Sequence, residues 1–195
     1  MKRINLAVTV LLGIFLLAAC TAVGERTVVS VGYYTVSGDT FGQLDKEIKL
    51  HGPNVTGVGK ALASTDLRMV PDIRYERSGS KCGVSQVRIN VKARVTLPRH
   101  SNERKLKKDL ARAWSNLEEY ARVHEAVHLA IADRYALIME KAISSLKPQD
   151  TCKLMREDVQ AAFSKLFEEH HAEQLQFDKD EKTRIRKLTA QAQIN

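Results

Sequence analysis

The feature that most restricts the possible folds is the stretch of residues 102–147, which contains neither proline nor glycine. Apolar and aromatic residues recur along this stretch at helical spacing: Leu110, Ala113, Trp114, Leu117, Ala121, Ile131, Tyr135 and Ile138. Because this spacing places them on one face, it predicts a long helix with a buried stripe. Residues 151–177 carry a second stripe after a loop at 148–150. The C-terminal half is therefore expected to form a hairpin of two long helices.

The sequence before residue 100 favours strands. Residues 28–36 are rich in valine and tyrosine, and residues 58–75 predict a further strand with breaks near Pro71. Residues 87–97 alternate apolar and polar side chains with a period of two, which is typical of a strand with one buried face. A short helix is expected over residues 41–50. The predicted fold class is α+β, in which three or four antiparallel strands and one short helix precede the helical hairpin.

The N-terminus has the features of an export signal. Lys2 and Arg3 are followed by a mostly apolar run over residues 4–17, which is too short to span a bilayer comfortably. The sequence Leu17-Ala18-Ala19-Cys20 resembles the bacterial lipobox, in which the cysteine is acylated. An ordinary cleaved signal or a short anchor is the alternative. We expect a signal peptide over 1–19, a lipidated Cys20 and tether over 20–27, a single domain over 28–185, and a charged tail over 186–195.

This organisation predicts a protein of the bacterial envelope that is held to a membrane by its lipid. The residue after the cysteine is Thr21 rather than aspartate, which by the same resemblance favours the outer membrane, facing the periplasm. The chain has a formal net charge of +8, but its basic residues are spread among many acidic ones and form no stripe with aromatic residues. We therefore expect no nucleic-acid partner.

The cysteine content agrees with export. Apart from Cys20, the chain contains only Cys82 and Cys152. In an oxidising compartment an even pair favours a disulfide over two free thiols. Metal binding by these two cysteines is the weaker interpretation, because neither lies in a Cys-x-x-Cys spacing.

The chemistry is expected at the sequence His124-Glu125-Ala126-Val127-His128, which lies inside the first predicted long helix. Two histidines four residues apart lie on one helix face and can share one zinc ion. Glu125 would then lie beside the metal, where it can take a proton from the attacking water as a general base. The alternative is a pair of ordinary histidines on a half-buried face.

A zinc site of this kind needs a third protein ligand. Arg134 stands six residues after His128, where one well-known spacing has a histidine, so that arrangement is excluded. Counting back along an antiparallel second helix brings His170 and its neighbours level with the motif. His170 lies on the apolar stripe and is the first choice for third ligand, with Glu173 as the alternative. A buried structural histidine is the competing interpretation of His170.

Residues distributed along most of the chain carry a family resemblance. They are Tyr34-Thr35-Val36-Ser37-Gly38, His51-Gly52-Pro53, Thr65, Cys82, Thr96-Leu97-Pro98, Trp114, His124-Glu125-x-x-His128, and Cys152 with Leu154. Their order and spacing over about residues 33–183 resemble domain-of-unknown-function family 922, which is described as predicted secreted or periplasmic zinc-dependent proteases. The resemblance implies a zincin-like domain, a zinc cofactor and a Cys82–Cys152 disulfide. The family's Tyr-Asp…Thr…His-Gly ending is here Phe177-Asp178…Thr183, without the His-Gly.

Three hypotheses for function follow. The first is a zinc-dependent metallopeptidase that hydrolyses peptides or proteins of the envelope, with Glu125 as base and His124, His128 and His170 as ligands. The second is a catalytically inactive lipoprotein that keeps the fold and binds a metal or a partner, which the missing His-Gly favours. The third is a structural lipoprotein whose helices pack against another envelope component. The sequence determines neither the substrate nor the oligomeric state.

Overall fold

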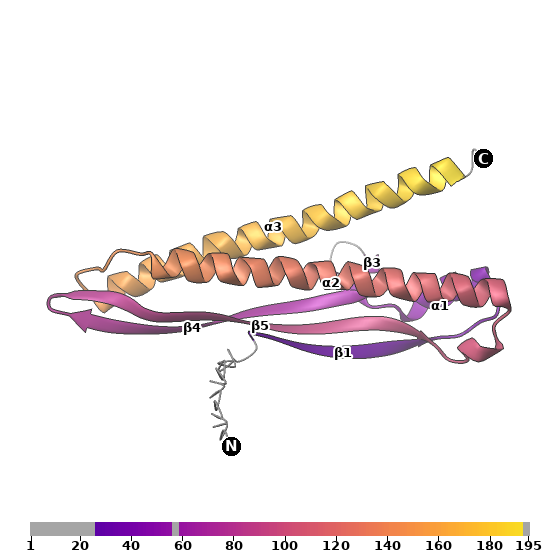
Figure 1. Ribbon diagram of the computed structural model, residues 1–195, viewed down its shortest axis with the longest axis horizontal. Helices are drawn as coiled ribbons and strands as arrows, with labels where there is room; N and C mark the ends of the chain where they lie inside the picture. Colours follow the sequence, from indigo (N-terminus) through magenta and orange to yellow (C-terminus); the bar gives the residue numbers. More distant parts are fainter. Residues whose placement is uncertain (1–25, 56–58, 193–195) are drawn as a thin grey trace, which may run out of the picture.

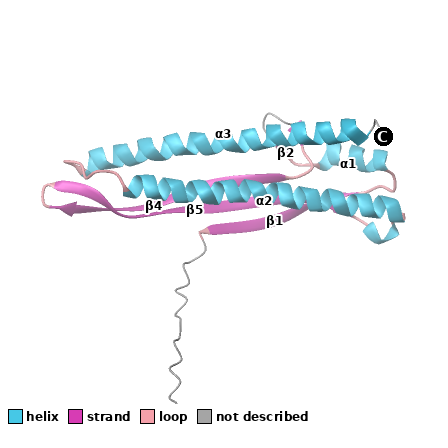
Figure 2. Ribbon diagram, turned by 45° about the horizontal axis from the view of Figure 1, so that its top comes forward, coloured by secondary structure: helices cyan, strands magenta, loops and turns pink. Residues whose placement is uncertain are grey.

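The computed structural model describes residues 26–55 and 59–192. The predicted signal peptide, Cys20 and most of the predicted tether lie outside these ranges. The elements are β1 (Thr27–Val36), α1 (Phe41–His51), β2 (Asn54–Val55), β3 (Gly59–Lys60), β4 (Ser64–Ser78), β5 (Lys81–His100), a short 3-10 helix (Glu103–Lys105), α2 (Lys108–Ser144) and α3 (Cys152–Ala192). An elongated sheet lies under α2, and α3 runs back beside α2 (Figures 1 and 2). The predicted α+β class, with an N-terminal sheet and C-terminal helices, is confirmed.

The main sheet has the strand order β1-β5-β4. β4 and β5 form an antiparallel hairpin, but β1 pairs with β5 in parallel, from Thr27 opposite Val91 to Val36 opposite His100. The prediction of a purely antiparallel sheet was therefore wrong for β1. β5 is the strand with the alternating apolar residues, and it takes the central position because its inward face, including Ile89 and Val91, is fully buried.

The predicted strand over residues 58–75 corresponds to two separate strands, β3 and β4. β3 pairs with the preceding β2 in a small antiparallel hairpin. β4 then runs without interruption past Pro71, which pairs with Ile89. A proline is accommodated here because β4 is an edge strand, where one side of the backbone needs no ladder partner. The expected break at Pro71 is therefore absent from β4.

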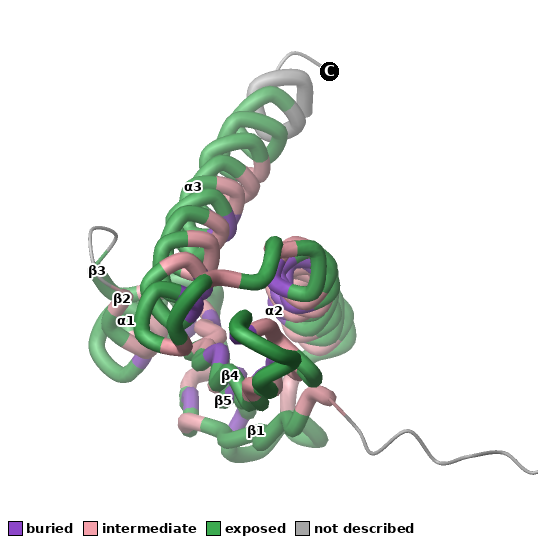
Figure 3. Tube along the Cα trace, turned by 90° about the vertical axis from the view of Figure 1, so that its left-hand side faces the viewer, coloured by how far each residue is buried: buried purple, intermediate pink, exposed green. Residues whose placement is uncertain are grey.

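The core lies between the sheet and the two long helices. Ile89 and Val91 of β5 belong to one buried cluster with Ala132, Met139 and Ile143 of α2. Met155 and Val159 of α3 complete this cluster, and they are buried as well. Viewed along the long axis, most of α3 is exposed, whereas α2 lies directly over the strands (Figure 3). The N-terminal part of α3 is therefore the part whose side chains pack in the core.

The second long helix differs from its predicted limit. α2 starts at Lys108, after the 3-10 turn. α3 continues past the predicted end at residue 177 to Ala192. The extension contains no helix-breaking residue and carries a charge pair one turn apart, in which Arg184 Nε donates to Glu181 Oε1 at 2.7 Å. Among the described residues, no helix has the length and apolar composition needed to cross a membrane.

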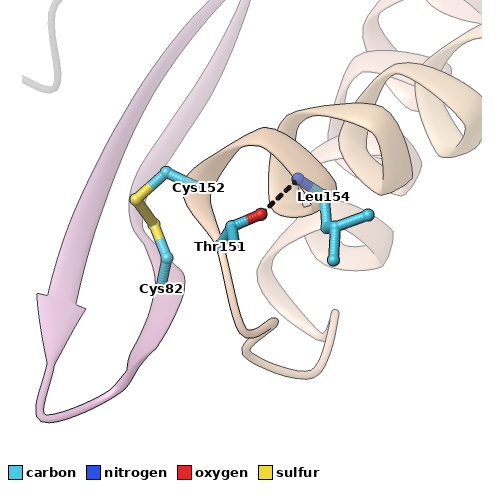
Figure 4. Close-up of a disulfide and its surroundings, with 4 residues drawn as sticks. All are labelled: Cys82, Thr151, Cys152 and Leu154. Atoms are coloured by element: carbon cyan, nitrogen blue, oxygen red, sulfur yellow. Dashed lines mark hydrogen bonds between the residues drawn. A yellow bond between two sulfur atoms is a disulfide. The ribbon is translucent and has the colours of Figure 1, made fainter.

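The predicted Cys82–Cys152 disulfide is present and joins the start of β5 to the start of α3 (Figure 4). The backbone of Cys82 also pairs with Gln149 in both directions, at 2.8 and 2.9 Å. Thr151 Oγ1 accepts a hydrogen bond from the backbone N–H of Leu154 at 3.2 Å, which satisfies one of the free donors in the first turn of α3. These contacts fix where α3 begins relative to the sheet.

Candidate functional site

The His-Glu-x-x-His motif lies near the middle of α2, on consecutive turns of an unbroken helix. The Nε2 atoms of His124 and His128 are 3.2 Å apart. Both imidazole rings are largely buried, with 18% and 13% of their side-chain surface exposed. The sequence spacing therefore brings the two nitrogens together as expected.

α3 contributes a carboxylate to this pair. Asp178 Oδ1 lies 3.2 Å from His124 Nε2 and 3.1 Å from His128 Nε2. The neighbouring Phe177 packs against both imidazoles, with ring centroids 4.8 Å from His124 and 5.1 Å from His128. His124, His128 and Asp178 are thus held as one group, which we call the His-His-Asp cluster.

The cluster has the dimensions of a zinc site. Nitrogen and oxygen ligands placed tetrahedrally around zinc, about 2.0–2.1 Å from the ion, lie roughly 3.3 Å from one another. The three separations in the cluster are 3.1, 3.2 and 3.2 Å, so the three atoms already form the corresponding triangle. Two neutral imidazoles and one carboxylate are also ligand types that zinc prefers. The donor set and its spacing therefore fit one zinc ion.

The electrostatics of the cluster follow from the same contacts. Burial alone would raise the pKa of Asp178, but the hydrogen bonds and charges of His124 and His128 outweigh it and hold this pKa well below its usual range. Burial alone would lower the pKa of His128, but its hydrogen bonds to Asp178 and Gln174 outweigh it and the pKa is raised. The carboxylate is therefore ionised at neutral pH, ready to interact with a cation.

The carboxylate of Glu125 contacts the sheet. Glu125 is 4% exposed, and its Oε2 accepts a hydrogen bond of 2.6 Å from Thr65 Oγ1 on β4. Burial raises the pKa of Glu125, while the hydrogen bond from Thr65 and the charges of the two histidines oppose the rise. A carboxylate with a raised pKa is a better proton acceptor near neutral pH than an ordinary one. β4 is at the edge of its sheet, so this carboxylate lies beside an edge strand.

The family model for "Bacterial protein of unknown function (DUF922)" matches residues 31–184. The chain belongs to this family. The matched region contains most of the sheet, the disulfide, the His-Glu-x-x-His motif and Asp178, so the cluster lies within the DUF922 domain. No curated protein and no solved structure matches the chain.

The structure places the two residues expected to supply a third ligand outside the cluster of this DUF922 protein. His170 is 5% exposed, packs edge-on against Tyr135 at 5.5 Å, and has its Nε2 2.9 Å from Nε2 of Gln174. Glu173 pairs instead with Arg134. Among the described residues, Asp178 is the one that joins the two histidines in a group of possible metal ligands.

The sequence did not predict Asp178, because the expected alignment assumed that the end of α2 and the start of α3 lie level with each other. Gln174, not a residue near 170, lies level with His128. α3 starts farther out than α2 ends, because Cys152 is tied to Cys82 and the loop backbone pairs with the sheet at Gln149. The displacement from His170 to Gln174 is four residues, which corresponds to roughly 6 Å of helix. The signal that pointed to Asp178 was the Phe177-Asp178 pair, which stands where the family has Tyr-Asp.

Proposed function

We propose that this DUF922 protein is a zinc-dependent peptidase of the bacterial envelope, with a zincin-like arrangement of motif helix and edge strand. His124, His128 and Asp178 would hold the zinc, and Glu125 would act as general base. The observation that carries the proposal is the triangle of 3.1–3.2 Å separations between the three ligand atoms, next to a buried carboxylate. Export and lipidation at Cys20 remain part of the proposal and rest on the sequence of residues 1–20.

Zinc at such a site supplies Lewis acidity, which polarises a carbonyl group and acidifies water. Glu125 would accept the proton of the attacking water on its carboxylate and later deliver it to the leaving amine. Thr65 holds Oε2 of Glu125, so the proton-accepting group has a fixed orientation. The raised pKa of Glu125 suits a group that both accepts and returns a proton near neutral pH.

The neighbouring edge strand supports a peptide substrate. Thr65 lies on β4 at the edge of the three-stranded sheet, so the hydrogen bond to Glu125 connects the base to this edge. An extended peptide can add to an exposed edge through main-chain hydrogen bonds. A peptide laid along this part of β4 would pass close to Glu125. The proposed substrate class is therefore an extended segment of a peptide or an unfolded protein.

The test uses the full chain purified from a bacterial envelope in detergent. We expect about one zinc per chain by elemental analysis and zinc-dependent cleavage of fluorescein-labelled casein. Glu125→Gln should keep the zinc and lose the cleavage, because the ligands remain and the base does not. His124→Ala should lose both. A wild-type chain that takes up no zinc after reconstitution would contradict the proposal.

A second candidate is a metal-binding or partner-binding lipoprotein without catalysis. Glu125 is only 4% exposed and is already engaged by Thr65, which favours a carboxylate closed off from substrate. This candidate predicts one zinc per chain and no cleavage in either the wild type or Glu125→Gln. The same pair of measurements therefore separates the two functions.

A further inference from the structure

We propose that an apolar hollow between α1 and α2 is a subsite that takes a large apolar side chain of the peptide substrate. This inference rests on the proposed peptidase function and deepens it by naming the kind of peptide. The hollow has a volume of about 460 Å³, and the two helices that form it lie at the same end of the molecule (Figure 1). Its apolar lining includes Leu44, Ile48, Leu62, Ala113, Trp114 and Leu117.

The floor of the hollow is part of the core. Leu44 of α1 and Trp114 of α2 are buried and belong to one cluster. Ile48 and Leu117 are partly buried and pack against this cluster. The volume falls within the roughly 300–1,000 Å³ of ligand pockets, and apolar walls suit an apolar occupant. The packing of the fold therefore fixes the floor of a hollow that is large enough for an aromatic side chain.

The wall at Leu62 is held in place by two kinds of contact. Tyr34 Oη donates a hydrogen bond of 2.8 Å to the carbonyl oxygen of Leu62. The end of α1 also approaches this segment so closely that a Cβ at Gly52 would lie 2.2 Å from the carbonyl oxygen of Ala61. Glycine is needed for such a close approach, because it has no Cβ. Residues 61–62 are thus fixed against α1, and the hollow is preformed.

The hollow lies on the same face of α2 as the His-His-Asp cluster. Leu117 precedes His124 by seven residues, which is two turns, so the two side chains share a helix face about 10 Å apart. The chain gives a second measure, because Leu62 precedes Thr65 by three residues, at most about 10 Å of extended chain. Thr65 in turn holds Glu125 through its hydroxyl. Both routes place the hollow about 10 Å from the proposed reacting groups.

This distance decides which substrate residue reaches the hollow. An extended peptide advances about 3.3 Å per residue, so a distance of about 10 Å corresponds to three residues. A peptide that lies along the edge strand β4 and is cleaved beside Glu125 would therefore place the third residue from the cleaved bond at the hollow. The lining also includes Asp45, an exposed residue that pairs with Lys49 at 2.5 Å. Burial between apolar walls favours phenylalanine or leucine in the subsite, and the carboxylate of Asp45 disfavours glutamate.

The first experiment tests the hollow without catalysis, on the full chain with metal removed by chelator. The chain is held in phospholipid nanodiscs, because free detergent would compete for the hollow. The probe is N-acetylphenylalaninamide, and methyl NMR follows Ile48, Leu62 and Leu117. Their signals should shift together and saturate, and the corresponding glutamate derivative should leave them in place. Ala113→Leu fills part of the hollow and should weaken binding of the probe about tenfold. Signals that do not move with the phenylalanine probe overturn the inference.

The second experiment reads the substrate preference from cleavage of unfolded casein, with the fragments identified by mass spectrometry. Phenylalanine and leucine should be enriched at the third residue from the cleaved bond, on one side of it, and this side gives the direction of the peptide along β4. In Ala113→Leu the preference at this residue should move to alanine and valine.

Ser115→Leu is the matched control for this experiment. It places the same side chain at an exposed position of α2 outside the hollow and should keep the wild-type preference. If Ala113→Leu fails to fold, Leu117→Gln takes its place and should lose the enrichment at the third residue. Wild-type cleavage without an apolar preference at this residue, or an unchanged preference in a folded Ala113→Leu, overturns the inference.

The two experiments separate failure of the inference from failure of the proposed function. A wild-type chain that takes up no zinc and cleaves no casein contradicts the proposed peptidase, and the first experiment still decides whether the hollow binds an apolar side chain. A chain that cleaves casein, while the probe leaves the signals of the hollow in place, contradicts only the subsite.

Discussion

Asp178 Oδ1 lies 3.1 Å from Nε2 of His128, so a carboxylate from α3 completes the group that two histidines of α2 begin. The contact depends on the packing of two helices and not on local sequence. Phe177 supports it by packing against both imidazoles, and Gln174 contacts His128 one turn earlier on α3. The geometry of the cluster therefore depends on the position of α3 along α2.

Replacing Asp178 is expected to abolish stable zinc binding. Asp178→Ala removes one of three protein ligands, so the loss in zinc affinity should exceed the roughly 10–100-fold typical of changes around a ligand. His170→Ala should cost less, because it acts only through Gln174. Equilibrium dialysis with zinc measures both. Asp180→Ala, an exposed position on the same helix, is the control. Zinc retained by Asp178→Ala and lost by His170→Ala would return the third-ligand role to His170.

Removing the hydroxyl of Thr65 should shift the acid limb of the pH–rate profile. The hydrogen bond from Thr65 stabilises the ionised form of Glu125 and opposes the rise in its pKa caused by burial. In Thr65→Val the pKa of Glu125 should therefore rise further. Because the base must be ionised to accept a proton, kcat/KM should begin to fall at a higher pH than in the wild type. Thr65→Ser keeps a hydroxyl and should follow the wild-type profile. An acid limb that does not move in Thr65→Val would remove Thr65 from this role.

His170 should make the fold less stable in mild acid. Burial lowers the pKa of His170 from its ordinary value of 6.5 to about 4, so between these pH values the unfolded chain binds a proton that the folded chain does not. The free energy of unfolding should then fall as pH decreases through this window, by at most about 1.4 kcal/mol per pH unit from this group. Urea unfolding of metal-free protein between pH 4 and 7 measures the slope. The slope should decrease in His170→Gln and not in the exposed control His171→Gln.

Reducing the disulfide should lower stability and loosen the start of α3. Cys82 and Cys152 are 70 residues apart in the chain, and a cross-link closing such a loop is worth about 4 kcal/mol in the chain-entropy description. The double variant Cys82→Ser/Cys152→Ser should unfold at lower urea concentration than the oxidised wild type. Its zinc affinity should also fall, because the disulfide sets where α3 begins and hence where Asp178 lies. Reductant should affect the wild type and have no effect on the double variant. Equal stability of the wild type with and without reductant would contradict this prediction.

Several elements could be predicted because their cause is local. The alternation of residues 87–97 gives β5 its buried face, and the stretch without glycine or proline gives α2 its length. The spacing of His124 and His128 places both on one face of a helix, whatever that helix packs against. The pairing of Cys82 with Cys152 followed from their number and the family resemblance, and the structure confirms it.

Other features depended on contacts between distant segments. β1 pairs in parallel with β5 because β5 is inserted between β1 and β4, and no property of residues 27–36 alone specifies that neighbour. The end of α3 also differed from its predicted position, since helix ends depend on what the flanking residues contact.

The sequence by itself determined the two long helices, the central strand and the pair of histidines with the glutamate between them. Only the tertiary structure decided that Asp178 joins the pair and that His170 contacts Gln174 instead. The physical reason is that helical periodicity fixes which face a residue lies on but not how far one helix slides along another. In this protein the disulfide at Cys152 and the backbone pairing at Gln149 set that distance.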